Sequence, residues 1–222
     1  MAVKLSSHTL KIIAIIAMTI DHIAFVFVPP NTILYAVMRI IGRLTFPIMA
    51  YMLVEGFHHT KNRRKYLSRM AVFAVISQPF YLLMVGGGLR LNVLFTFSVA
   101  LIMLMVIESK RLNGISKVIL VSACFVVSFI CDWSWIGLLL IFVYCKFRDN
   151  AEARITMHFF ISTLACFWYG GLQLGILLAL IPLSMYNGER GGSGKPLNKW
   201  FFYGFYAAHM AALVAVKFLF QN

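Results

Sequence analysis

Ionisable side chains interrupt three of the most apolar stretches of this sequence. Asp21 and His22 are adjacent in the first apolar run, and Arg39 and Arg43 lie four residues apart in the second. That spacing puts both arginines on one face of a helix. His209 lies about nine residues into the last apolar run. Charged groups are expensive inside hydrocarbon, so each of these residues is a candidate for function.

These residue types suit acyl transfer. His22 is a candidate general base, and a nearby arginine could stabilise an oxyanion. We expect Asp21 and Arg43 to meet at one depth on antiparallel neighbouring helices, with Asp21 neutralising Arg43. Two alternatives remain: a buried ion pair that only fixes helix packing, and a proton-coupled transporter.

Other polar residues flank this set. Pro47 lacks an N–H and releases the Arg43 carbonyl from its helical bond. Asn92 opens a helix, as a cap or as a substrate contact. Asp132 is expected to be a wet loop residue. Glu55 and His58 form a Glu-x-x-His pair, but the chain has only seven acids for the further ligands that such a centre needs, so we expect no metal.

Composition places all of these residues in a membrane protein. The 222 residues are 61% hydrophobic and 12% charged, against about 25% charged in soluble domains. The net charge of +13 sits in short tracts between apolar runs, which is typical of loops at a membrane surface and not of a nucleic-acid interface. The four cysteines show no CxxC spacing and are expected to be reduced.

We therefore predict an all-α, polytopic transmembrane bundle of about nine spans, forming a single domain over residues 1–222, with the N-terminus in the cytoplasm. The expected spans are 9–28, 33–58, 67–85, 92–107, 118–132, 134–147, 155–169, 171–186 and 200–220. The fifth and sixth are short and could together form one re-entrant hairpin. With the N-terminus inside, sixteen of the 20 Lys and Arg residues, among them Lys195, fall on the inner side and only Arg90 and Lys217 on the outer side.

Four motifs resemble the TraX family: "MTIDHIAFVF", "GRLTFPIMAYMLVEGFHHTKNRRKYLSR", "LNVLFTF" and "KWFFYGFYAAHMAAL". The resemblance covers about residues 11–217. It implies membership of a wider group of integral-membrane acyltransferases, which take acetyl groups from cytoplasmic acetyl-CoA and deliver them to outward-facing acceptors. The type member N-acetylates a conjugative pilin.

The resemblance implies a multi-pass acetyltransferase of the bacterial cytoplasmic membrane. Its partners would be acetyl-CoA, membrane lipids and a pilin or other envelope acceptor. The implied catalytic residues are His22, Asp21, Arg43 and His209. We expect the acetyl-CoA site to comprise Arg39, Arg43, Lys61, Arg63, Arg64, Lys65 and Arg69. The implied acceptor contacts are Asn92, Glu55, His58 and Tyr206. A transporter and a non-catalytic pilus or envelope assembly factor remain alternatives.

The charge bias makes a direct topological prediction. In a cysteine-free background, a cysteine placed at Asn62 should be labelled from the cytoplasmic side and one at Gly87 from the outer side. Membrane-impermeant maleimide applied to intact cells and to inverted vesicles distinguishes the two sides. Labelling of both positions from the same side would contradict the predicted orientation and the route proposed for acetyl-CoA.

Overall fold

The computed structural model describes residues 4–191 and 199–221, and it is helical throughout that part of the chain. The only extended pairings among these residues are two isolated bridges, Leu5 with Tyr186 and Leu91 with Cys131. The helices are α1 (Ser7–Phe27), α2 (Ile33–Gly42), α3 (Thr45–His59), α4 (Arg63–Val85), α5 (Val93–Ile107), α6 (Gly114–Ser128), α7 (Ser134–Lys146), α8 (Ala151–Tyr169), η1 (Gly171–Gln173), α9 (Leu174–Leu178), α10 (Leu180–Ser184) and α11 (Lys199–Gln221). The predicted all-α fold is confirmed.

Each predicted span corresponds to a helix or to a broken helix. Four are long and apolar enough to cross a membrane: Ser7–Phe27, Ile33–His59, Arg63–Val85 and Trp200–Phe220. The remaining apolar helices are shorter. Among them, α6 and α7 are separate helices joined by residues 129–133. The span count and the side of the N-terminus therefore stay predictions. Lys195, assigned to the inner side, lies outside the described residues.

Two predicted spans are broken inside the bundle. The second splits at Arg43 and Leu44 into α2 and α3, so Pro47 lies in the first turn of α3, where a missing N–H costs little. The eighth splits into η1, α9 and α10, of which η1 and α9 pack beside α2 and α8. Non-helical backbone at membrane depth is tolerated where it is buried in protein or lines a cavity.

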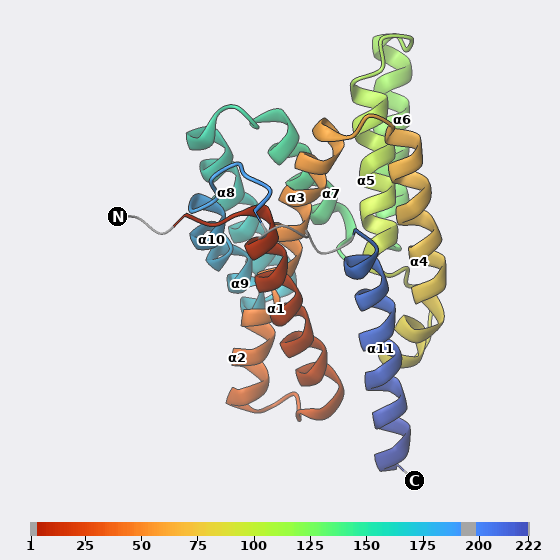
Figure 1. The fold of residues 1–222 in the computed structure, drawn as a ribbon, viewed down its shortest axis with the longest axis vertical. Helices are drawn as coiled ribbons and strands as arrows, with labels where there is room; N and C mark the ends of the chain where they lie inside the picture. Colours follow the sequence, from red (N-terminus) through yellow and green to blue (C-terminus); the bar gives the residue numbers. More distant parts are fainter. Residues whose placement is uncertain (1–3, 192–198, 222) are drawn as a thin grey trace.

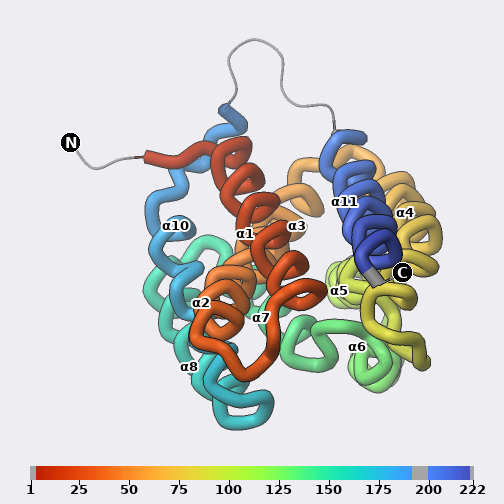
Figure 2. The backbone as a smooth tube through the Cα atoms, turned by 90° about the horizontal axis from the view of Figure 1, so that it is seen from below, coloured from red at the N-terminus to blue at the C-terminus, as the bar shows by residue number. Residues whose placement is uncertain are grey.

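Figures 1 and 2 both show α11 beside α4, on the far side of α1 from α2. The first and last long helices thus face one another, and α3 and α5 lie between the two halves of the bundle. In Figure 1 the α3–α4, α5–α6 and α7–α8 connections lie toward the upper end, as the alternation of antiparallel helices requires. The α1–α2 and α4–α5 connections lie toward the lower end.

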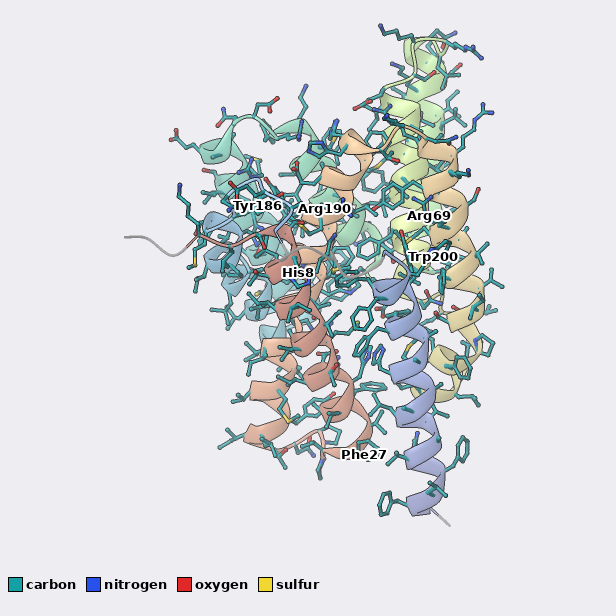
Figure 3. All side chains as sticks on the ribbon, viewed as in Figure 1. His8, Phe27, Arg69, Tyr186, Arg190 and Trp200 are labelled. Carbon is teal, nitrogen blue, oxygen red and sulfur yellow. The ribbon has the colours of Figure 1, made fainter. Side chains whose placement is uncertain are left out.

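Six of the described helices begin with a side-chain cap. The side chains of Ser6, Thr32, Asn62, Asn113 and Asn150 accept hydrogen bonds from N–H groups in the first turns of α1, α2, α4, α6 and α8. Segment 185–191 satisfies two further N–H groups of α1, because Ser7 N donates to the Glu189 carbonyl and His8 N to that of Arg190. Figure 3 labels His8, Tyr186 and Arg190 side by side at this point.

Asn92 caps α5, and unlike the others it is fully buried. Its Oδ1 accepts from Leu94 N, while its Nδ2 donates to the Ala74 carbonyl and to Gln78 Oε1, both at 2.8 Å. One side chain therefore holds the start of α5 against α4. The capping interpretation of Asn92 is confirmed.

The outer surface of the bundle is apolar. On α6, for example, Ile115, Val118, Ile119, Val126 and Val127 are exposed. The small core contains Phe46, Ile48, Phe57, Leu104 and Tyr144, all fully buried. Monomeric soluble proteins rarely expose contiguous apolar patches beyond a few hundred Å². The structure is therefore that of a membrane protein whose polar groups are turned inward.

Replacing Asn92 should destabilise the protein more than replacing an exposed cap. Asn92→Ala removes a cap together with two interior hydrogen bonds, to the Ala74 carbonyl and to Gln78 Oε1, at a cost of about 2–4 kcal/mol. The matched control, Asn113→Ala, removes only an exposed cap and should cost about 1 kcal/mol. Thermal unfolding in detergent would compare them. Equal effects would contradict the role of Asn92 as a clamp between α4 and α5.

Candidate functional site

A cavity of about 310 Å³ runs through the middle of the bundle between α1, α3, α4, α5 and α11. At one end its lining includes Lys11, Thr60 and Arg69, and at the other it includes Asp21 and Asp132. Lys11 and Asp21 are ten residues apart on α1, so the cavity follows that helix for about 15 Å. Figure 3 shows side chains of α1 and α11 meeting in the space between the two helices.

Asp21 is the centre of a buried ion cluster. Its Oδ2 accepts a hydrogen bond from Arg39 Nη1 at 2.6 Å, and its Oδ1 lies 3.9 Å from Arg43 Nη2. All three side chains are about 85% buried. The predicted approach of Asp21 and Arg43 is confirmed, but the shorter and hydrogen-bonded partner is Arg39. The two arginines share one face, so a single carboxylate serves both.

A glycine makes this cluster possible. A Cβ atom added to Gly42 would collide with the Cβ, Cγ and Oδ1 atoms of Asp21. Gly42 is the last residue of α2, next to the break before α3. The absence of a side chain there lets the carboxylate lie against the backbone of α2, between the two arginines.

His22 is hydrogen-bonded to His209, and the bond determines which nitrogens carry protons. His22 Nδ1 and His209 Nε2 are 2.7 Å apart, with the ring planes 4° from parallel. His209 Nδ1 lies 2.8 Å from the Phe205 carbonyl. A carbonyl can only accept, so His209 Nδ1 carries a proton, and in the neutral ring Nε2 is an acceptor. His22 Nδ1 must then be the donor.

The consequence is an unprotonated nitrogen on a residue that lines the cavity. In neutral His22, Nε2 is left with a free lone pair, and His22 is one of the residues that line the cavity. In many active sites a general base is held in position by a third group that hydrogen-bonds to it. His209 holds His22 in the same way. The two candidate histidines therefore form one unit, with His22 presented to the cavity and His209 behind it.

Sequence reasoning missed Asp132, which lines the cavity and is open to it. Its Oδ1 accepts a hydrogen bond from Tyr81 Oη at 3.0 Å. The expectation of a wet loop residue identified the loop and the exposure, but not that the loop folds inward beside Arg43 and Trp133. The available signal was the rarity of acids: Asp132 is one of seven in the chain.

The predicted acetyl-CoA residues separate into two groups. Arg69 lines the cavity, stacked near the ring of Tyr66, and Lys11 is a second cation in the lining that the sequence did not single out. Figure 3 shows Arg69 just above Trp200, which lies at the start of α11. Lys61, Arg64 and Lys65 lie outside the cavity lining, and Arg63 pairs with Glu108 at 2.6 Å. The structure therefore does not bring this basic tract together as one site.

The predicted acceptor contacts also separate. Tyr206 is buried and lines the cavity, whereas Asn92 is a structural cap. Glu55 pairs with Arg148 at 2.9 Å, which raises the pKa of that guanidinium, and lies 3.6 Å from His59. His58 faces Glu108 and Cys145. Glu55 and His58 are thus outside the cavity lining and do not act together.

The fold and the site define a helical membrane protein with a buried ion cluster and an oriented histidine at an internal cavity. The model of the TraX protein family matches residues 6–217, and the chain belongs to that family. It is 33% identical to a probable fimbrial assembly protein FimC, serogroup H1, of Dichelobacter nodosus, over 99% of this chain and 98% of the relative. It is also 33% identical to an uncharacterized protein of Rickettsia prowazekii (strain Madrid E), over 39% of this chain and 32% of that protein. No solved structure matches the chain.

Two double-mutant cycles test the ion cluster. Removing one member of a buried pair typically costs about 3–5 kcal/mol, because a charge is left without its partner. Asp21→Asn combined with Arg39→Gln should therefore show strong non-additivity in thermal stability. Because Arg43 has only the 3.9 Å contact, coupling between Asp21→Asn and Arg43→Gln should be weaker. Additive effects in both cycles would contradict the observed pairing.

Proposed function

We propose that this protein is an acetyltransferase that moves an acetyl group from acetyl-CoA to an acceptor in the bacterial envelope. The observation that carries the proposal is the His22–His209 pair, which leaves a basic nitrogen at an internal cavity. The ion cluster of Asp21, Arg39 and Arg43 beside it supplies positive charge where an oxyanion would form. Family membership supports the same reaction class.

In the proposed reaction an acceptor amine attacks the carbonyl carbon of the thioester. A C–N bond forms, the C–S bond breaks, and the amine loses a proton to His22 Nε2. The proton then passes to the departing thiolate of CoA, so charge and atoms balance. The imidazolium formed on His22 donates its Nδ1 proton to His209 Nε2, which stabilises it. Arg43 has one Nη group near Asp21 and can direct its other N–H groups toward the oxyanion.

The donor would enter from the end of the cavity that contains Lys11 and Arg69. Two cations suit the phosphates of CoA, and the remaining lining is largely apolar, which suits a narrow acyl-carrying arm. Lys61, Arg64 and Lys65 are close in sequence to this end and would attract the anionic nucleotide before it binds. With the predicted orientation, that end faces the cytoplasm.

The acceptor would approach from the opposite end, near Asp21, Asp132 and Trp133. The Dichelobacter relative carries the name of a fimbrial assembly protein, which supports a pilus-related envelope acceptor, such as the N-terminal amine of a pilin. The same name favours a second candidate function, a non-catalytic factor in pilus assembly. The purified protein would transfer acetyl groups if it is an acetyltransferase, and would not if it is a non-catalytic assembly factor.

Replacement of His22 tests the proposal. A positioned base contributes about 10²–10⁴-fold in rate, so His22→Ala should lose that much acetyl transfer to an N-terminal pilin peptide while acetyl-CoA binding is retained. The measurement is single-turnover transfer of radiolabelled acetyl by protein in detergent, with binding measured separately. His59→Ala, which changes a histidine outside the cavity lining, is the control and should be unaffected.

His209 provides a graded test of the same unit. His209→Ala should lose less activity than His22→Ala, because it removes the orienting group and not the base. His209→Gln should retain more, since its amide oxygen can accept the proton of His22 Nδ1. Normal turnover in His22→Ala together with loss in His209→Ala would assign the base to the other ring. Normal turnover in both would contradict catalysis in this cavity.

A further inference from the structure

We propose that His58, Glu108 and Cys145 form a binding site for a divalent transition-metal ion of the Zn²⁺ type, at the end of the bundle predicted to face the cytoplasm. The proposal is independent of acetyl transfer and concerns a different part of the molecule. Each ligand comes from the end of a different helix: His58 from α3, Glu108 just after α5, and Cys145 from the last turn of α7.

The three donor atoms are already gathered. One donor atom from each residue lies within 4.8 Å of the other two. His58 Nε2 is 3.5 Å from Cys145 Sγ, and His58 Nδ1 is 3.8 Å from Glu108 Oε1. Zinc binds nitrogen and oxygen at about 2.0–2.2 Å and sulfur at about 2.3 Å. An imidazole binds an ion through one nitrogen, and the two contacts use different nitrogens, so a rotation of the His58 or Glu108 side chain is needed to close the site.

The three donors are close enough to share one ion. His58 Nε2 faces Cys145 Sγ and His58 Nδ1 faces Glu108 Oε1, so the ring lies between the sulfur and the carboxylate, as it also does in a cysteine–histidine–carboxylate relay. One ring nitrogen, the sulfur and one carboxylate oxygen nevertheless lie within 4.8 Å of one another, which brings them within reach of a single ion. A metal-bound thiolate is protected from alkylation, whereas a relay makes the thiol reactive, so the two arrangements differ in a measurable way.

Neighbouring side chains hold the carboxylate in a ligating position. Arg63 Nη2 donates to Glu108 Oε2 at 2.6 Å, which leaves Oε1 directed toward His58. Arg63 is itself held over the ring of Phe57 at 4.0 Å. Metal-bound carboxylates are commonly hydrogen-bonded in this way through the oxygen that does not bind the metal.

The donor types select the ion. A thiolate, an imidazole and a carboxylate are unsuited to Mg²⁺ or Ca²⁺, which prefer oxygen ligands alone, and they match the ligands of Zn²⁺. The negative charges of the thiolate and the carboxylate balance the ion. With three protein ligands a fourth position is left for water. The expectation of no metal concerns a Glu55-x-x-His58 centre, for which the seven acids of the chain are too few. In the structure Glu55 pairs with Arg148, and His58 faces Glu108 and Cys145 instead.

The location indicates a structural role. The central cavity, as the described residues line it, does not include any of the three ligands. An ion there would join the ends of α3, α5 and α7 without meeting a substrate. Because α3 begins beside Arg43, the ion would hold the far end of the helix that carries one wall of the cavity.

The test uses the full chain with a non-histidine tag, in a Cys124→Ser, Cys131→Ser, Cys166→Ser background in which Cys145 is the sole thiol. After chelator treatment, Co²⁺ should produce a thiolate-to-metal charge-transfer band that saturates at one equivalent, and one equivalent of Zn²⁺ should abolish it. Zn²⁺ should also protect Cys145 from maleimide and raise the unfolding temperature.

Matched variants separate this site from other binding. Cys145→Ser should abolish the band, and His58→Gln and Glu108→Gln should weaken binding by more than the roughly 10–100-fold that loss of an outer-shell partner costs. His59→Gln changes the adjacent exposed histidine and should bind as the parent does. If Cys145→Ser fails to fold, maleimide protection and the other two variants still decide.

Three results would overturn the proposal. They are the absence of a charge-transfer band when Cys145 is the sole thiol, unchanged affinity in both His58→Gln and Glu108→Gln, and rapid alkylation of Cys145 that Zn²⁺ does not slow. Rapid alkylation that Zn²⁺ does not slow would identify Cys145 as a reactive thiol beside the His58 imidazole. Acetyl transfer is not a readout in these measurements, so they are independent of the function proposed for the cavity.

Discussion

The structure depends on one constraint, which is that a charge in the interior of a membrane protein must have a partner at the same depth. Asp21 meets that need for two arginines at once, with a 2.6 Å bond to Arg39 and a 3.9 Å approach to Arg43. Such clusters contribute little net stability, because the cost of removing the groups from water offsets their attraction. Their effect is to fix which face of α1 meets which face of α2.

The other features of the site follow from that pairing. Gly42 has no side chain because the Asp21 carboxylate occupies the space where a Cβ would lie. The helix breaks one residue later, so the backbone turns into α3 beside the cavity. With α1 fixed by Asp21, the next residue, His22, faces away from α2 toward α11. His209 can then bind it, and the two rings form a hydrogen-bonded pair between α1 and α11.

Much of this could be predicted from the sequence, because the bilayer imposes simple rules. Apolar runs located every helix, and the rarity of charge within them identified Asp21, His22, Arg39, Arg43 and His209, all of which lie in the ion cluster or the histidine pair. The prediction failed where contacts join distant segments. Asp132 and Lys11 reach the cavity through tertiary packing, and the His58, Glu108 and Cys145 set joins helix ends without a spacing motif. The sequence predicted one site for the basic tract from Lys61 to Arg69, because the sequence gives the charges but not the direction in which each side chain points.

The bond between His22 and His209 joins residues 187 positions apart, on the first and last helices. Nearly the whole chain must therefore be synthesised and inserted before the base acquires its orienting partner. The ion pair between α1 and α2 joins helices that are neighbours in the sequence, so it does not require α11, whereas the histidine pair does. A chain truncated before α11 would keep the pairing of Asp21 with Arg39, but the ring of His22 would have no hydrogen-bond partner from α11. The orientation of the His22 ring is therefore set only in a molecule that contains α11.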